Sequence, residues 1–404
     1  MPNRSLGKAE LLDSVHQACG WLTDVAQVKH TKLSDEPGTR TAKCHYADWR
    51  GAAGEYTQRD RSWLYFCPIW HTGQAVRSLA RASQLLAEPK ILDAAKFSAE
   101  FVLRHRVADP ADEDYGLILG FEDYPDKVNI SAILESLAGP LDLAEVTGEN
   151  RYFETVRSAA EWVLRKAYLP EHGLLRDVYD PAARAFQAEN KFQAVGRPIA
   201  DDAVLLTVGR RTGNEAMVRA FYRILDYLMQ HEDPPGNWIT VAPCSAARKS
   251  IHPRHAYWFG TPFIDAFLDT RDDRYLQVAI RAGRWYLQAQ RRDGGLFRGT
   301  YRDFSTDSFG HATSGIACAV KLWSRLWSIT GSDEWIEPSA RAISFCRLMQ
   351  MTNPEDPNLR GCIVEKILPP DGTDRSLLNV RDLASIFYIQ AVCEAMASGL
   401  AERW

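Results

Sequence analysis

Two adjacent carboxyl groups stand at the start of an apolar, helix-forming stretch of this sequence. Asp201 and Asp202 precede the run AVLLTVG, which has the composition of a buried helix. Two neighbouring acids cannot both cap one helix, and each charge raises the pKa of the other. A carboxyl group with a raised pKa exchanges protons near neutral pH. We therefore expect Asp202 to be a catalytic acid or base, with Asp201 as a cap, a supporting group or a substrate contact.

The segment IHPRHAYWFG concentrates side chains that suit a sugar ligand. Aromatic rings such as Tyr257 and Trp258 stack on sugars, and Arg254 and His255 carry donors for hydroxyl or carboxylate groups. His252 and His255 resemble a metal-binding spacing only weakly, because no acid ligand stands beside them, so neither a metal nor another cofactor is expected. We expect substrate contact here, with His255 as a catalytic candidate; a purely structural loop is the alternative.

Other apolar stretches also begin with polar or aromatic residues. Asp126 is a candidate second catalytic carboxylate, and helix capping is the alternative role for Asp126, Asp307 and Ser308. Trp70 is expected to contact substrate, and packing in the core is its alternative role. His71 precedes small residues and is expected to face a cavity. The remaining candidates for substrate contact are Asn129, Arg197, Asp303, His311, Arg381 and Asp382.

A recurring phrase indicates how these segments are positioned. Its copies read EVTGENRYFETVRSAAEWVL, GRRTGNEAMVRAFYRILDYL, FLDTRDDRYLQVAIRAGRWYL and SITGSDEWIEPSARAISFCRL, and their turns lie about 60 residues apart. In each copy a glycine or its equivalent ends one helix, and apolar residues then recur at helical spacing. Between copies, YGLILGFED, HGLLRDVYD and GGLFRGTYRD predict short β segments.

The repeats predict six helical hairpins. The expected inner helices lie in residues 68–83, 128–144, 197–209, 255–268, 308–323 and 380–396. A helix from Lys8 to about Gln27 supplies the sixth outer partner beside the helix Leu383 to Met396. We predict an all-α fold, a closed (α/α)6 toroid with short β segments at its mouth, where the entry segments converge. An open solenoid is the alternative.

Residues 30–66 form the longest stretch without repeat character. They include His45, Tyr46, Trp49, Tyr56, Trp63 and Tyr65, a content that argues against disorder. We expect one domain, residues 1–404, in which this insertion covers the mouth and Trp49 contacts substrate. Contact between protomers is the alternative, so a homo-oligomer stays open.

Composition narrows the functional classes. The 404 residues are 46% hydrophobic and carry a net charge of −4 with scattered signs, which argues against a nucleic-acid partner. No apolar run is long enough to span a membrane, and the N-terminus lacks the pattern of a signal peptide. The eight cysteines form no CxxC pair, so neither zinc nor a disulfide framework is expected. We expect a cytoplasmic protein whose partner is a small carbohydrate.

Residues 195–330 resemble the unsaturated glucuronyl and unsaturated rhamnogalacturonyl hydrolases. The likeness lies in DDAVLLTVGRRTGNE, in YWFGTPFIDAFLD from Tyr257, and in the Ser/Thr segment HATSGIACAV, where Ser314 stands near the family's substrate carboxylate. The resemblance implies an (α/α)6 glycosidase in which Asp202 protonates the double bond of a 4,5-unsaturated uronide and Arg254 or Arg381 holds its carboxylate. Ordinary hydrolysis instead pairs Asp202 with Asp126 or Asp303.

Three other functions stay open. Sugar epimerases and isomerases of the acylglucosamine 2-epimerase type are similar barrels that use paired imidazoles, for which His71, His255 and His311 are candidates. A polysaccharide lyase would use Tyr257 and His255. A protein-binding scaffold would carry its aromatic and acidic residues on the outer face.

Overall fold

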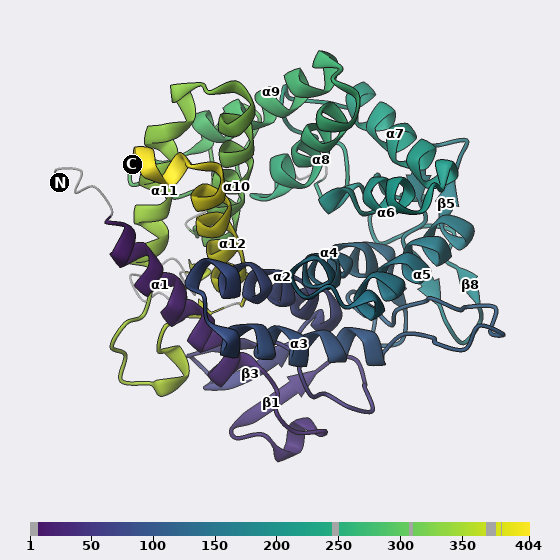
Figure 1. Cartoon of the computed structure of the whole chain (residues 1–404), viewed down its shortest axis with the longest axis horizontal. Helices are drawn as coiled ribbons and strands as arrows, with labels where there is room; N and C mark the ends of the chain where they lie inside the picture. Colours follow the sequence, from purple (N-terminus) through teal and green to yellow (C-terminus); the bar gives the residue numbers. More distant parts are fainter. Residues whose placement is uncertain (1–6, 245–249, 307–309, 369–376, 381) are drawn as a thin grey trace.

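The computed structural model describes residues 7–244, 250–306, 310–368, 377–380 and 382–404, and forms two concentric rings of helices (Figure 1). The inner ring consists of α2 (Pro68–Leu86), α4 (Ile130–Thr147), α6 (Val204–Thr212), α8 (His255–Thr270), α10 (Thr313–Thr330) and α12 (Asp382–Ser398). The outer ring consists of α1 (Lys8–Gly20), α3 (Pro89–Arg104), α5 (Asn150–Lys166), α7 (Glu215–Gln230), α9 (Asp273–Ala289) and α11 (Ile336–Leu348). The predicted all-α toroid of six hairpins is therefore confirmed.

The two rings differ in how much of each helix is buried. In α4 nearly every residue is buried, whereas α7 buries one face that includes Phe221 and Leu228. The predicted turn residues end the inner helices in the left-handed region, with φ of 72° at Gly148 and 62° at Arg271. Glycine adopts this φ without steric cost, which explains why the repeated turns favour it.

The ring closes through its first and last helices. Ser14 on α1 lies 2.7 Å from the Tyr388 hydroxyl on α12, and the Ser78 hydroxyl on α2 donates to the Ile386 carbonyl of α12 at 2.9 Å. The backbones of α2 and α4 also approach each other closely at Gly73 and Gly139. A Cβ atom at either position would clash with the backbone of the facing helix. These contacts exclude the open solenoid.

Short strands surround the helices. The largest sheet has the order β1-β3-β2-β10-β9, in which only β1 and β3 are parallel. Its strands are β1 (Thr39–Ala42), β2 (Glu55–Thr57), β3 (Ser62–Tyr65), β9 (Lys366–Leu368) and β10 (Leu377–Val380). Smaller sheets combine β4 (Val128–Asn129), β7 (Val178–Asp180) and β8 (Ala185–Phe186), and β5 (Tyr168–Leu169) with β6 (Leu174–Leu175).

The insertion at residues 30–66 is thus the core of a sheet that the segment before α12 completes. Trp63 is buried and stacks on Trp21 of the π-helix η1 (Trp21–Ala26), with ring centroids 6.3 Å apart. That the insertion covers the mouth stays a prediction. Among the described helices, none has the length and hydropathy needed to cross a bilayer.

Candidate functional site

The entries to the inner helices bring buried polar side chains together at one end of the ring. A strained backbone marks one entry, since Asp202 and Ala203 both have positive φ, 55° and 49°. Strain of this kind collects at functional sites, where the surrounding structure stabilises it. The site described below consists of the residues at these entries and is called the mouth.

Two buried carboxyl groups at the mouth have raised pKa values. Glu135 of α4 and Asp201, just before α6, are 7% and 8% exposed. Burial and the nearby Asp201 charge raise the pKa of Glu135 well above its usual value, while burial and the Asp202 charge raise that of Asp201. Asp201 Oδ1 has no hydrogen-bond partner among the described residues. The pair therefore retains a proton at a pH where an exposed carboxyl group has lost it.

Asp202 behaves in the opposite way. Burial alone would raise its pKa, but Arg77 and Lys321 outweigh burial, so the pKa of Asp202 is lowered. Arg77 forms an ion pair with its carboxylate, and Gln74 Nε2 donates to it at 3.1 Å. The expected raised pKa at Asp202 is therefore wrong; the raised pKa belongs to its neighbour Asp201.

Arg254 lies between aromatic rings at the mouth. Its guanidinium carbon is 5.6 Å from the centre of the Trp70 ring and 5.0 Å from that of Trp258. Nη1 donates to Ser314 Oγ at 2.7 Å, and Ser314 in turn donates to Glu365 at 2.7 Å. No other hydrogen bond of this guanidinium to a described residue exists, and its Nε is buried without a partner. Ser314 thus orients Arg254, with Glu365 Oε1 3.9 Å from Nη1, and the remaining donors make no hydrogen bond to the residues that the structure describes.

Three imidazoles also reach the mouth. The Nε2 atoms of His71, His255 and His311 are buried and have no hydrogen-bond partner within the described chain. Nδ1 of His71 faces Asp382, and Nδ1 of His255 lies 3.2 Å from the Asn237 amide oxygen. Burial lowers the pKa of His255 to about 3 and also lowers that of His311, so both rings are neutral at physiological pH.

Tyr257 is buried between inner helices and is not placed as a catalytic base. Its hydroxyl accepts a hydrogen bond from Lys321 of α10, and its ring is buried. Burial and the charge of Asp202 raise its pKa well above the usual value. A neutral phenol in this position does not support the lyase hypothesis.

Several predicted site residues lie elsewhere. The Asp126 side chain is 72% exposed and lies 3.8 Å from Lys127, while Asp303 is exposed and accepts hydrogen bonds from Ser305 in its own turn. Trp49 packs on Phe101 of the outer helix α3, with ring centroids 6.1 Å apart. Trp49 is therefore buried in core contacts, whereas Asp126 and Asp303 are exposed, and the predicted roles of all three stay predictions. Arg381, Asp307 and Ser308 lie outside the described residues.

Three buried acids at the mouth were missed by the sequence analysis: Glu55, Glu135 and Glu365. Glu135 is the one acid in the apolar run ISAILESLAGPL, a signal that could have identified it. Glu55 and Glu365 belong to segments without helical periodicity, so only the tertiary fold reveals their positions. Arg197 was expected at the mouth, and its Nη1 donates to Ser131 Oγ at 2.9 Å there.

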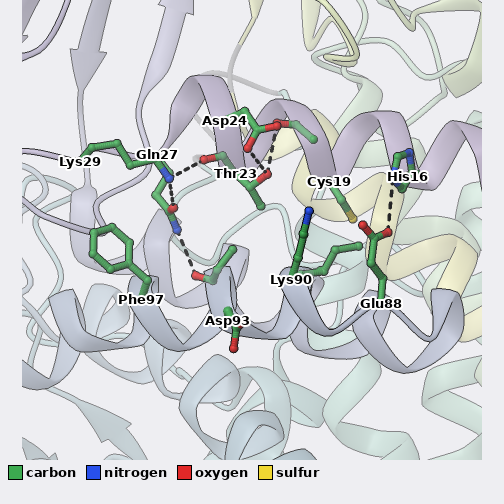
Figure 2. A pocket seen from close by; sticks show the side chains of 13 residues that line it. His16, Cys19, Thr23, Asp24, Gln27, Lys29, Glu88, Lys90, Asp93 and Phe97 are labelled. Carbon is green, nitrogen blue, oxygen red and sulfur yellow. Dashed lines mark hydrogen bonds and ion pairs between the residues drawn. The ribbon is translucent and has the colours of Figure 1, made fainter.

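Two clefts lie away from this site. One, of about 400 Å³, runs between α3 and the segment α1–η1 (Figure 2). Within it His16 Nε2 lies 3.3 Å from Glu88, and Lys29 Nζ donates to the Thr23 carbonyl at 2.7 Å. The other, of about 600 Å³, is lined by the C-terminal parts of α2, α4 and α12. Neither cleft includes a residue proposed for chemistry.

Comparison with known proteins confirms the fold. The unsaturated glucuronyl hydrolase specific for heparin has a TM-score of 0.66 and 13% identity, covering 97% of this chain and 99% of that protein. The cellobiose 2-epimerase from Bacillus thermoamylovorans has a TM-score of 0.68 and 10% identity, with 96% and 99% coverage. A possible GH105 member from Salmonella enterica has a TM-score of 0.62 and 12% identity, with 98% and 96% coverage.

These similarities define the class of the fold, an (α/α)6 barrel of the type found in glycosidases and sugar epimerases. No protein-family model matches the sequence, and no curated protein is significantly similar to it. The structural resemblance to unsaturated glucuronyl hydrolases is thus confirmed at the level of fold. Identities below 15% leave the reaction to be argued from the site itself.

Proposed function

We propose that this chain is a carbohydrate-active enzyme, a glycoside hydrolase for uronic-acid-containing oligosaccharides that uses Glu135 and Asp201 as its acid. The observation that carries this proposal is that Glu135 and Asp201 are both buried at the mouth and both have raised pKa values, the Asp201 charge raising that of Glu135. A proton held near neutral pH is what general-acid catalysis of glycoside cleavage requires. This pair replaces Asp202, whose ion pair with Arg77 makes it a poor acid.

For a 4,5-unsaturated uronide, the proton goes from the pair to the enol-ether double bond. Water then adds to the resulting oxocarbenium carbon and returns a proton to the pair. The hemiketal formed in this way opens and releases the rest of the oligosaccharide. One protonated carboxyl group is sufficient for this sequence, whereas ordinary hydrolysis needs a second carboxylate on the opposite face of the sugar.

Arg254 supplies the specificity in this proposal. Its remaining donors lie between Trp70 and Trp258, so a sugar that stacks on either ring can place its carboxylate against the guanidinium. Arg254 also lowers the pKa of Glu135, although less than burial raises it, which indicates that the anion site and the acid are neighbours. We also propose a cytoplasmic location, which the eight buried, unpaired cysteines support.

A sugar epimerase or isomerase is the second candidate. The observation that favours it is the set of three imidazole Nε2 atoms without partners, since a neutral imidazole can accept a proton from carbon. Structural neighbours with this fold include both a cellobiose 2-epimerase and a D-mannose isomerase.

One substrate screen separates these candidates. The purified chain is incubated in deuterated water with unsaturated uronic-acid disaccharides, their saturated and neutral counterparts, and free sugars. Hydrolysis predicts loss of the ultraviolet absorbance of the unsaturated uronide, and the variant Asp201→Asn abolishes it. Deuterium incorporated at carbon 2 of a free sugar, without glycoside cleavage, would instead establish the epimerase. No turnover of any uronide would contradict the hydrolase proposal.

A further inference from the structure

Three buried ligand-type side chains from separate elements meet beside the mouth. They are Glu55 of β2, His71 of α2 and Asp382 at the start of α12. Their side chains are 7%, 1% and 0% exposed. Each offers one ligand atom, and these atoms all lie within 4.8 Å of one another.

The distances approach those of a metal site. His71 Nδ1 lies 2.9 Å from Asp382 Oδ1 and 3.7 Å from Glu55 Oε1. Nitrogen and oxygen ligands bind a divalent ion at about 2.0–2.2 Å, which places neighbouring ligand atoms roughly 3.0–3.5 Å apart. The two distances from His71 are close to this spacing, and the Glu55 and Asp382 oxygens, within 4.8 Å of each other, approach further when they share one ion.

The hydrogen bond between His71 and Asp382 leaves one oxygen of the Asp382 carboxylate unused. Nδ1 of His71 carries at most one proton, and its hydrogen bond goes to Asp382 Oδ2 at 3.1 Å. Asp382 Oδ1 is buried, lies closer to Nδ1, and has no hydrogen-bond partner among the residues that the structure describes. A buried carboxylate oxygen without a partner is costly, and a cation beside it removes that cost.

We propose that Glu55, His71 and Asp382 bind one divalent transition-metal ion, for which Mn²⁺ and Zn²⁺ are suitable probes. Two carboxylates and a neutral imidazole match the charge and the mixed N/O preference of such ions. When Nδ1 of the neutral His71 imidazole binds the ion, the single ring proton is carried by Nε2, which is then a donor. The ion joins strand β2 of the insertion to two inner helices. The proposal is independent of the proposed function.

Metal binding is measured on the full-length chain after removal of metals with a chelator. Titration with Mn²⁺, followed by loss of the free-ion electron paramagnetic resonance signal, should give one equivalent bound. Zn²⁺ in calorimetry should give the same stoichiometry. At a metal concentration of about 100 times Kd, we expect Tm to rise by about 4 °C. Wild-type protein that binds no stoichiometric metal, with unchanged Tm, overturns the proposal.

The variants Glu55→Gln and Asp382→Asn should each weaken binding at least tenfold, because each removes a ligand charge. Glu365→Gln is the matched control: Glu365 is equally buried at the mouth but is not one of the three ligands, so its variant should keep wild-type affinity. His71→Gln tests the same site from α2 if a carboxylate variant does not fold. Equal affinity in wild type and in the folded ligand variants would also overturn the proposal.

Discussion

Buried charges occur at the mouth and also in a second group between the inner helices, which is called the axis and consists of Arg77, Arg81, Asp142, Asp202, Lys321 and Glu394. The two groups differ in how their charges are paired. Along the axis each carboxylate meets an arginine: Asp202 pairs with Arg77, and Asp142 accepts from Arg81, which also bonds Glu394. At the mouth, by contrast, the Asp201 charge raises the pKa of Glu135, and Arg254, Asp201 and three imidazoles keep buried atoms without hydrogen-bond partners in the described structure. Arg77 Nε on the axis also has no hydrogen-bond partner there, but a carboxylate oxygen of Asp142 lies 3.3 Å from it.

The difference separates structural charge from functional charge. A buried ion pair whose partners satisfy each other stabilises the arrangement of the helices around it, and its removal leaves one charge unpaired. Polar groups without partners cost stability, and their retention indicates a ligand that completes them. We therefore infer that the axis charges stabilise the fold and that the mouth charges bind substrate or act in catalysis. The adjacent residues Asp201 and Asp202 fall on opposite sides of this division.

The largest expected effect is a loss of catalysis when an acid at the mouth is replaced. Asp201→Asn should lower kcat for the uronide substrate by a factor of about 10²–10⁴, the usual range for a lost acid, because an amide cannot take the place of a carboxylic acid as proton donor. Tm should change little, since a protonated carboxyl group and an amide have similar shapes. Steady-state kinetics and calorimetry check both results. Wild-type kcat would remove Asp201 from the mechanism.

The same substitution one residue later should affect the fold instead. Asp202→Asn removes one of the two carboxylates that Arg77 contacts, and Asp142, 3.3 Å from Arg77 Nε, remains, so we expect a loss of up to about 3 kcal/mol in the free energy of unfolding. Asparagine tolerates the positive φ at this position, so backbone strain adds little. Denaturant unfolding of the two variants side by side measures the contrast. Equal stabilities would show that the axis pair has no structural role.

A smaller effect concerns specificity. Arg254→Met should raise KM for a uronide about 10- to 100-fold, because a charge-assisted, bidentate contact is lost. The corresponding neutral glycoside should show an unchanged KM, and this comparison is the control. If both substrates lose affinity equally, Arg254 supports the packing of Trp70 and Trp258 and does not read the carboxylate.

The smallest effect is a pH dependence at the axis. Burial lowers the pKa of Lys321 to about 7, from 10.5. Between these values the unfolded chain binds more protons than the folded chain, so stability rises with pH in this window. Lys321→Met should flatten that rise by a few degrees in Tm between pH 7 and 10. Parallel Tm curves for wild type and variant would contradict the lowered pKa.

Local sequence signals predicted the helical hairpins, but they did not predict which of the buried carboxyl groups has a raised pKa. Helical periodicity and left-handed turn residues such as Gly148 act within a few residues, so the hairpins could be predicted. The pKa of Asp202 depends on Arg77, which lies 125 positions away in the sequence. Trp49 faces Phe101 of the outer helix for the same reason: a tertiary contact, invisible in the sequence, decides its position.

The central claim is that the Glu135–Asp201 pair holds a proton at neutral pH, and infrared spectroscopy tests it without a substrate. The difference spectrum between wild type and the double variant Glu135→Gln/Asp201→Asn isolates the pair at pH 7. We predict the carbonyl stretch of one protonated carboxyl group in wild type, which disappears on raising the pH as the pair ionises. A difference spectrum that shows only ionised carboxylates at pH 7 would contradict the account.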